Sequence, residues 1–337
     1  MSDPSAGELQ APILIAGFGS IGQRHFRNLK SLGCKNFILY RTRQGTLDDE
    51  LAADCRSTSV LAEALSWRPR MAIVSNPTSM HMPVALAAAR AGCDLFLEKP
   101  LSHQLTDCAE LTDLVRAHSL VTMIGCQFRF HPLLSRLRAE LQAGRLGTVV
   151  SANAEWGEYL PGWHPWEDHR KSYSARSDLG GGVILTLIHP LDYLYWLFGP
   201  VGRLHASTRA VESLGTDAGE DCAEIIAEFI SGPLARVHLD YFQRPATHTL
   251  AIAGDAGSAT LDFHAQTLTW QLIDGSTSVD TVPADFERNT MFVDEMRHFL
   301  TAVEQRAQTD IPLADGVAVL DIALRAKTSA QEKRSDV

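Results

Sequence analysis

The segment that decides the fold reads Ile13-Leu14-Ile15-Ala16-Gly17-Phe18-Gly19-Ser20-Ile21-Gly22, and a stretch with helical spacing of apolar residues follows it. It places G-x-G-x-x-G between a short apolar strand and a helix, the context in which this motif binds a dinucleotide. The first glycine permits a tight turn, the second lets the backbone approach the pyrophosphate, and the third allows close packing of the helix. The start of the helix offers N–H groups to the anion. The segment therefore predicts a dinucleotide site made by Gly17, Phe18, Gly19, Ser20, Ile21 and Gly22.

The N-terminal part alternates short β-rich runs with helical stretches, as a parallel α/β sheet does. A helix candidate at 82–91 ends before Gly92, which suits a C-cap position. We expect residues 1–126 to form an α/β Rossmann domain with a parallel sheet. Its strands are expected at 12–16, 36–40, 71–75, 94–97 and 120–125.

After Cys126 the pattern changes to β-rich segments separated by hairpin-type turns. These features predict an α+β domain over residues 127–337, which contains a large, mostly antiparallel open sheet and binds the substrate. The closing helices are expected to pack back across the domain boundary. Strands are expected at 148–155, 204–211, 223–230, 235–241, 247–253, 258–263 and 267–273, and helices at 132–143, 182–198, 289–306 and 313–329.

Composition limits the partners of the chain. A net charge of −10 over 337 residues argues against a nucleic-acid surface, which is normally basic. The sequence contains no run of about 18 apolar residues, so we expect no membrane span. It also lacks the basic segment with which a signal peptide begins, so we expect no signal peptide. The six cysteines lack any C-x-x-C pair, so we expect reduced, buried thiols and a cytoplasmic protein. No residue cluster has the spacing of a metal site.

The residues after the second strand bear on the choice of cofactor. An NAD enzyme usually places an acid there for the ribose hydroxyls, but this chain continues with Arg41, Thr42 and Arg43. Two guanidinium groups and a hydroxyl suit a 2′-phosphate. We therefore expect NADP rather than NAD, with a solvated basic loop and NAD binding as the alternative.

The run at 94–97 ends in Glu98-Lys99-Pro100. A lysine at the carboxyl end of a parallel strand faces the crevice in which open α/β sheets bind ligands. Pro100 restricts the backbone of Lys99 to an extended form, which helps to orient its side chain. On composition alone such a Glu-Lys pair is typical of a solvated surface.

Several motifs occur in a fixed order over most of the chain. They are Gly17-x-Gly19-x-x-Gly22 with His25, Ser75-Asn76-Pro77 with His81, Gly92, Glu98-Lys99-Pro100, Phe128-Arg129-Phe130-His131-Pro132, and Gly180-Gly181-Gly182 leading to His189 and Asp192. In this combination the sequence resembles the Gfo/Idh/MocA oxidoreductase family, which includes glucose–fructose oxidoreductase and inositol dehydrogenases.

The resemblance implies a C-terminal open sheet that often mediates oligomerisation, so we expect a homo-dimer or homo-tetramer. It also implies that Lys99 contacts both the nicotinamide and the reacting hydroxyl of the substrate. Such a lysine can stabilise a developing alkoxide, or accept its proton. Further cofactor contacts are expected from Asn76, Pro77, His81 and Glu98.

The sequence departs from the family pattern before the motif histidine. Many members carry an Asp four residues before it, whereas this chain has Leu185 there and Thr186 one residue later. On one continuous helix Thr186, His189 and Asp192 would share a face. We therefore expect His189 to accept the proton and Asp192 to orient it, with a purely structural His–Asp pair as the alternative.

The segment 155–170 is rich in Trp, His and carboxylates, and basic and aromatic residues follow it. Aromatic rings beside hydrogen-bonding groups suit a sugar or polyol, and the pattern resembles a branch of the family associated with bacterial surface-sugar genes. An aromatic-rich interface or a lid is the alternative. The expected substrate contacts are Arg129, Trp163, His164, Trp166, Arg170, Tyr173, Arg176 and His189.

These features together predict an NAD(P)-dependent dehydrogenase or reductase acting on a sugar, polyol or nucleotide-sugar. Two other functions stay open at this point. One is a cofactor-binding regulatory protein without turnover, which the missing Asp favours and the intact Glu98-Lys99-Pro100 opposes. The other is a redox-neutral glycosidase or lyase of the same fold, since fold alone does not fix the reaction.

Overall fold

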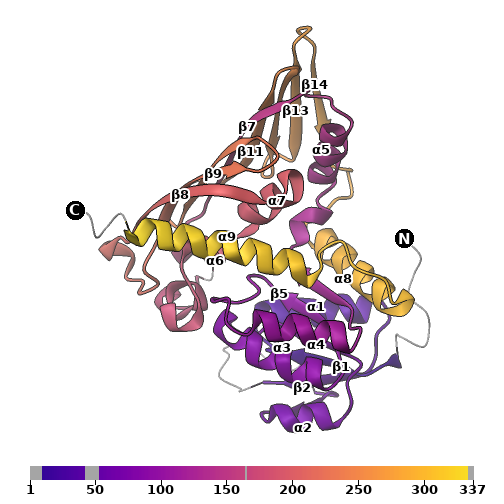
Figure 1. The fold of residues 1–337 in the computed structure, drawn as a ribbon. Helices are drawn as coiled ribbons and strands as arrows, with labels where there is room; N and C mark the ends of the chain where they lie inside the picture. The colour runs from indigo at the N-terminus through magenta and orange to yellow at the C-terminus, as the bar shows by residue number, and fades with distance from the viewer. Residues whose placement is uncertain (1–9, 42–52, 164, 333–337) are drawn as a thin grey trace. The chain divides into compact units, whose positions relative to one another are not determined.

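The structure, a computed structural model, describes residues 10–41, 53–163 and 165–332 (Figure 1). Backbone contacts divide the chain into two units. Unit 1 comprises Met1–Gln127 and Glu287–Val317, and unit 2 comprises Phe128–Phe286 and Ala318–Val337. The N-terminal domain, expected to end at residue 126, therefore also includes a segment from near the C-terminus.

Unit 1 contains a six-stranded sheet with the order β3-β2-β1-β4-β5-β6. All of its neighbouring strands run parallel. This is the strand order of the dinucleotide-binding Rossmann fold. The strands are β1 (Ile13–Ala16), β2 (Phe37–Tyr40), β3 (Arg56–Thr58), β4 (Met71–Val74), β5 (Asp94–Glu98) and β6 (Thr122–Gly125).

The helices of unit 1 cover this sheet. α1 packs against α8, and α3 packs against α4. The chain after α8 is tied to the sheet, because Arg306 bonds the carboxylate of Asp94 and the Thr309 hydroxyl donates to the carbonyl of Thr122. The helices are α1 (Ser20–Ser31), α2 (Leu61–Ser66), α3 (His81–Arg90), α4 (Cys108–Ala117) and α8 (Arg288–Gln305).

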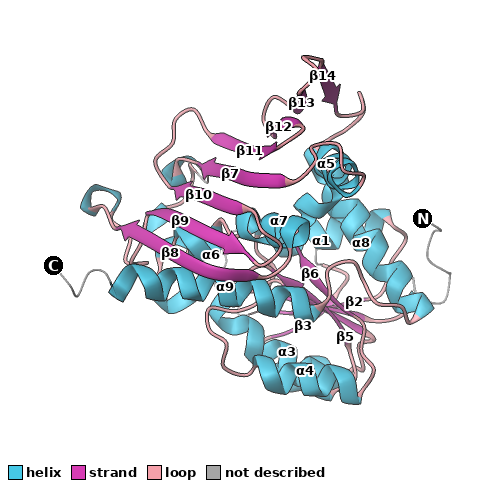
Figure 2. Cartoon of the chain, turned by 45° about the horizontal axis from the view of Figure 1, so that its top comes forward, coloured by secondary structure: helices cyan, strands magenta, loops and turns pink. Residues whose placement is uncertain are grey.

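Unit 2 contains an eight-stranded sheet with the order β14-β13-β12-β11-β7-β10-β9-β8 (Figure 2). All neighbouring pairs are antiparallel except β7 and β10, which run parallel. The predicted fold class is thus confirmed, and two strands were not predicted from the sequence, β14 in this sheet and β3 in unit 1. The strands are β7 (Val149–Gly157), β8 (Val201–Arg209), β9 (Cys222–Phe229), β10 (Leu234–Asp240), β11 (Thr247–Gly254), β12 (Gly257–Asp262), β13 (Thr267–Leu272) and β14 (Thr277–Thr281).

One face of this sheet carries the core of unit 2. In β10, Ala235, Val237 and Leu239 are fully buried, while Arg236 on the other face is exposed. This period of two is that of a sheet with one covered face. The helices in contact with its strands are α5 (Pro132–Gln142), α6 (Val183–Thr186) and α7 (His189–Phe198). The last helix, α9 (Leu313–Glu332), begins in unit 1 and ends in unit 2.

The prediction of one helix over 182–198 was wrong. α6 ends at Thr186 and α7 begins at His189. Pro190 explains the break, since it has no N–H to donate to the carbonyl of Thr186, and its ring would clash with that carbonyl in a continuous helix. In the structure Pro190 lies in the first turn of α7, where no such bond is needed.

Within the described residues no single helix is long and apolar enough to cross a membrane, and the bent pair Ser177–Thr186 and His189–Phe198 passes only by length and composition. No group of three or more metal-ligating side chains lies together in the described parts of the chain. The six cysteines are free thiols, and burial raises the pKa of Cys93 to about 12.

Candidate cofactor and catalytic site

The glycine loop after β1 forms a cradle in which two glycines are required by packing. Gly17 has φ +92, and a Cβ on it would lie 2.5 Å from the backbone nitrogen of Asn76. A Cβ on Gly22 would lie 2.2 Å from the carbonyl oxygen of Gly17. At Gly19 a Cβ would meet nothing within 4 Å. The backbone at Gly19 thus borders an open space, as a pyrophosphate cradle requires.

Neighbouring strands fix this loop. The Gly17 amide donates to the carbonyl of Tyr40 (2.9 Å), and the Ser75 hydroxyl donates to the carbonyl of Gly17 (3.0 Å). α1 begins at Ser20 with no side-chain cap and no acid in its first turn. Its first N–H groups are therefore suited to an anionic ligand. The residues present fit the pyrophosphate of a dinucleotide.

Arg41 follows β2 beside this cradle. Its Nε donates to the Ser57 hydroxyl (2.9 Å), and its guanidinium carbon lies 5.9 Å from the ring centre of Phe18. The last residue of β2 is Tyr40, so the usual acid is missing from the strand end. Thr42 and Arg43, which sequence analysis assigned to the same group, lie outside the described residues.

The loops after β4 and β5 are joined by His81. Its Nδ1 lies 3.0 Å from the carbonyl oxygen of Pro100, and its Nε2 lies 2.8 Å from that of Asn76. Burial lowers the pKa of His81, and contacts with these carbonyls oppose this effect. His81, expected to contact the cofactor, thus joins the backbones of Asn76 and Pro100, which are the chain neighbours of Pro77 and Lys99.

The backbone of Lys99 is held through Glu98. Glu98 Oε1 lies 2.6 Å from Nε2 of His25, a fully buried residue of α1. The other oxygen, Oε2, accepts a hydrogen bond from the amide of Lys99 (3.2 Å). Lys99 itself is half-buried at the carboxyl end of β5. The Glu98–His25 contact therefore positions the lysine relative to the helix that starts at the glycine cradle.

In unit 2 the structure pairs two residues that sequence analysis assigned to different roles. Arg129, expected to bind substrate, donates to both carboxylate oxygens of Asp192, at 3.0 Å from Nε to Oδ2 and 2.6 Å from Nη2 to Oδ1. Both side chains are only 2% exposed. The structure thus gives Arg129 as a partner of Asp192, and the orientation of His189 by Asp192 stays a prediction.

His189 is the first residue of α7 and is almost fully buried. Its ring stacks on that of Trp156 at 5.5 Å and meets the edge of Phe128 at 4.9 Å. Thr186, which was expected on the same helical face, lies on α6, and its hydroxyl interacts with Tyr241. Lys99 belongs to unit 1 and His189 to unit 2.

His248, which was not predicted from the sequence, belongs to the same group of ring contacts as Trp156, Phe128 and His189. The ring of His248 stacks on Trp156 (4.4 Å) and on Phe263 (4.0 Å), and the residue is buried. The signal was the alternation in β11, in which His248 occupies an inward position together with Leu250 and is flanked by threonines.

The segment predicted to line the substrate pocket forms a series of short turns. Trp163 contacts Tyr241 edge-on at 5.8 Å, whereas Trp166 is 68% exposed. Arg170 and Arg176 each form a bidentate pair with a nearby acid, Asp168 and Asp178 respectively. Such exposed pairs are weak, so both arginines can exchange their partner for a ligand at little cost. Tyr173 is half-buried, and His164 lies outside the described residues.

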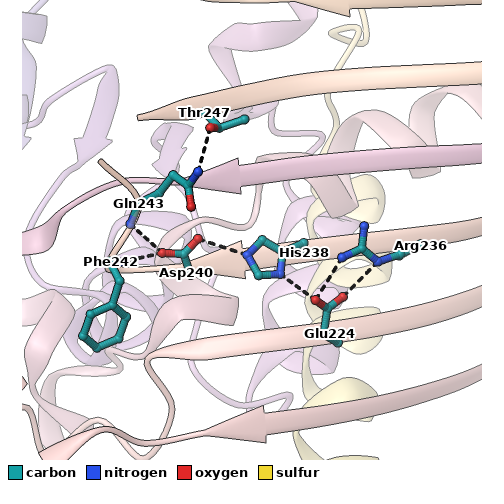
Figure 3. A network of polar contacts seen from close by, with 7 residues as sticks. All are labelled: Glu224, Arg236, His238, Asp240, Phe242, Gln243 and Thr247. Carbon is teal, nitrogen blue, oxygen red and sulfur yellow. Dashed lines mark hydrogen bonds and ion pairs between the residues drawn. The ribbon is translucent and has the colours of Figure 1, made fainter. Parts of the chain in front are cut away.

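The opposite face of the sheet carries a polar network that sequence analysis did not predict (Figure 3). His238 lies between two acids, with Nδ1 at 2.7 Å from Glu224 and Nε2 at 3.0 Å from Asp240. Asp240 also accepts from the amides of Phe242 and Gln243. Hydrogen bonds to the two acids, that to Asp240 first, raise the pKa of His238.

The sheet order, the glycine cradle and the lysine at the end of β5 define a dinucleotide-binding α/β protein with an additional α+β unit. Residues 12–126 match the oxidoreductase family with an NAD-binding Rossmann fold, and residues 134–260 match the GFO/IDH/MocA C-terminal domain. The chain therefore belongs to the Gfo/Idh/MocA family of NAD(P)-dependent dehydrogenases and reductases, and the resemblance noted in its motifs is confirmed.

Individual relatives are distant. An uncharacterised oxidoreductase from Synechocystis is 30% identical over 40% of this chain, and the match spans 36% of that protein. The NADP⁺-dependent D-xylose 1-dehydrogenase 2 of Haloferax volcanii is 26% identical over 72% of this chain and 73% of its own length. Levoglucosan dehydrogenase, solved with NADH and levoglucosan, shares the fold with a TM-score of 0.85 at 18% identity, covering 96% of this chain and 98% of that one.

Proposed function

We propose that the protein transfers a hydride between the nicotinamide of NADP and a hydroxyl or carbonyl carbon of a sugar, polyol or nucleotide-sugar. The observation that carries the proposal is the fixed position of Lys99, at the end of β5 and tied through Glu98 and His25 to the helix of the glycine cradle. The names of a xylose dehydrogenase and a levoglucosan dehydrogenase among the similar proteins support a sugar-like substrate.

The preference for NADP rests on the end of β2. Arg41 lies beside Phe18 of the cradle, and the position that would carry an acid for ribose hydroxyls is Tyr40. The planar guanidinium of Arg41, with that of Arg43 two residues later, suits bidentate binding of a 2′-phosphate. A carboxylate at the strand end would instead repel this phosphate. NAD binding is the alternative.

Oxidation of a secondary alcohol removes a hydride and a proton from the substrate. A bound nicotinamide accepts the hydride, or supplies it in the reverse direction. The cationic Lys99 would stabilise the developing alkoxide oxygen. We assign His189 to accept the hydroxyl proton, and Asp192 to hold α7 in place through Arg129 rather than to act on the substrate.

The substrate side of the proposal uses the turns between β7 and α6. The rings of Trp163, Trp166 and Tyr173 offer apolar faces for the C–H groups of a sugar. Arg170 and Arg176 would bind hydroxyl, carboxylate or phosphate oxygens of the ligand. His164 is retained as a further candidate. We also propose a homo-dimer or homo-tetramer, in keeping with the commonness of symmetric assemblies.

A second candidate function is a regulatory protein that binds the dinucleotide without turnover. Leu185 and Thr186 favour it, because neither can supply the carboxylate that many family members carry before the histidine. The four residues of α6, Val183 to Thr186, are all buried, and none of them has an ionisable side chain.

Calorimetric titration with NADP and NAD tests the cofactor assignment. We expect wild type to bind NADP at least about tenfold more tightly than NAD, a difference of about 1.4 kcal/mol. The double variant Arg41→Ala/Arg43→Ala should lose this preference and keep its affinity for NAD. Arg136→Ala, which removes an exposed arginine of α5 paired with Glu140, serves as the control. Equal binding of both cofactors by wild type would contradict the role of the arginines.

A further inference from the structure

A hollow of about 550 Å³ lies on unit 1 between α1 and α8. Three arginines line it: Arg24 and Arg27, which lie one helical turn apart on α1, and Arg288, the first residue of α8. Their neighbours in the lining are Asn, Gln and Ser, and no carboxylate belongs to it. This concentration of positive charge stands out in a chain whose net charge is −10.

The three guanidinium groups form no ion pair within the described residues. Arg24 is the most enclosed, and its pKa is lowered by burial first and then by the charges of Arg288 and Arg27. The carboxylate of Glu98 opposes this effect, but it is held by His25 and by the Lys99 amide. Like charges that crowd together without a counter-charge cost free energy, which an anion bound among them would offset.

Contacts restrict two of the three side chains, Arg24, which is half-buried, and Arg27, which like Arg288 is exposed. Arg24 lies over the ring of Phe292 at 4.5 Å, and Arg27 donates to the amide oxygen of Gln23 at 3.1 Å. The Asn289 amide donates to Asn28 Oδ1 at 2.9 Å, which joins the first turn of α8, where Arg288 lies, to α1. Because these contacts restrict Arg24 and Arg27 in advance, less conformational entropy of those two side chains remains to be lost on binding.

Arg288 occupies a position where a cation is unfavourable. It starts an 18-residue helix, whose N-terminal end carries partial positive charge and favours anions. The preceding Glu287 does not compensate within the hollow, because its carboxylate accepts the backbone N–H of Thr290 in a capping box. Arg288 therefore does not stabilise the start of α8. Together with Arg24 and Arg27 on α1, it can instead bind an external anion.

We propose that this hollow is a second anion site, which binds the phosphate group of a small molecule independently of the dinucleotide. Guanidinium groups bind phosphate oxygens through paired N–H donors, and the neighbouring Asn and Gln amides add neutral donors. The hollow is open to solvent and has room for a small molecule, so the ligand class is free phosphate or a phosphorylated metabolite. Ser20 borders both this hollow and the glycine cradle, while the three arginines lie one or more helical turns further along α1 or on α8.

Calorimetric titration of the full chain with inorganic phosphate and with glucose 6-phosphate tests the proposal. Each titration is run with and without saturating NADP on wild type, on Arg27→Ala/Arg288→Ala and on the control Arg136→Ala. We expect saturable binding to wild type and to the control, with or without NADP, and at least about tenfold weaker binding to the double variant. The single charge reversal Arg288→Glu should weaken binding likewise, which guards against misfolding of the double variant. Tighter binding of glucose 6-phosphate would identify a phosphorylated metabolite as the ligand class, and equal binding would identify the phosphate group alone.

Two results would overturn the second site. One is the absence of saturable binding to wild type. The other is binding that NADP abolishes and that both arginine variants retain, because the anion would then occupy the glycine cradle. The comparison of wild type with the variants does not depend on dinucleotide binding, so it stands even if the proposed cofactor fails to bind.

Discussion

Gly22 and Gly19 of the cradle differ in the space that surrounds them. Gly22 has no room for a side chain, because a Cβ would lie 2.2 Å from the Gly17 carbonyl oxygen. Gly19, in contrast, borders open space and has an extended backbone, with φ −75 and ψ −165. A methyl group at Gly19 would therefore meet no other atom of the protein within 4 Å, and in the proposed binding mode it would contact the pyrophosphate.

This contrast predicts different outcomes for two alanine variants. Gly19→Ala should keep the melting temperature of wild type and weaken NADP binding by about tenfold or more. Gly22→Ala should lower both the melting temperature and the affinity, because the start of α1 must move away from the loop. Thermal unfolding and calorimetry on both variants check this. Normal NADP affinity in Gly19→Ala would show that the pyrophosphate does not approach this backbone.

The pair Arg129–Asp192 leads to a prediction about stability. Asp192→Ala leaves the buried guanidinium of Arg129 without its counter-charge, and we expect it to lower the free energy of unfolding by about 3–5 kcal/mol. The matched control is Glu228→Ala, which breaks an exposed pair with Arg203 and should cost no more than about 1 kcal/mol. Urea unfolding measures both. Equal, small effects would mean that water or another group replaces the carboxylate.

At the scale of elements, the outer face of the sheet contains a group that responds to pH. Hydrogen bonds to Asp240 and Glu224 raise the pKa of His238 above 6.5 in the folded protein. Folding therefore favours the protonated form of His238. The contribution of this group to the free energy of unfolding is fully present below the pKa that the group has in the unfolded chain. That contribution is lost as the pH rises through the raised folded pKa.

The corresponding experiment compares the melting temperatures of wild type and His238→Gln across about pH 5.5 to pH 8.5. The difference should be largest at the acidic end and shrink as the pH rises. Arg236 also bonds Glu224 and stays charged throughout, so it does not reproduce this trend. A difference that stays constant or grows with pH would contradict the assignment to His238.

Local sequence patterns predicted most elements and failed where a single residue overrides periodicity. Most strands of both sheets were predicted from alternation and turn residues. Two short edge strands, β3 and β14, were missed because neither has a buried apolar pattern. The helix over 182–198 was predicted as continuous because its apolar content hides the effect of Pro190. The glycine cradle was predictable because its geometry depends on backbone requirements within a few residues.

At the scale of the whole molecule, the parts that were not predictable depend on contacts between distant residues. Arg129 and Asp192 are 63 positions apart, and nothing in either local sequence indicates that they pair. The amphipathic pattern of α8 predicts a helix but not which sheet it joins, and the structure places it in unit 1. The anion hollow depends on the same placement, because Arg288 comes from that helix.

The central claim is that the protein carries out hydride transfer that depends on Lys99. The measurement that tests it most directly follows the absorbance of reduced nicotinamide while wild type, Lys99→Ala and the control Lys35→Ala are screened with NADP and a panel of sugars, polyols and nucleotide-sugars. Lys35 is an exposed lysine of the same unit.

We predict that wild type and Lys35→Ala reduce NADP with at least one member of the panel. Lys99→Ala should lower kcat by on the order of 10²–10⁴-fold and still bind the dinucleotide, because the cradle is intact. Turnover by Lys99→Ala at the wild-type rate would contradict the account, and dinucleotide binding by wild type without turnover on any substrate would favour the regulatory function instead.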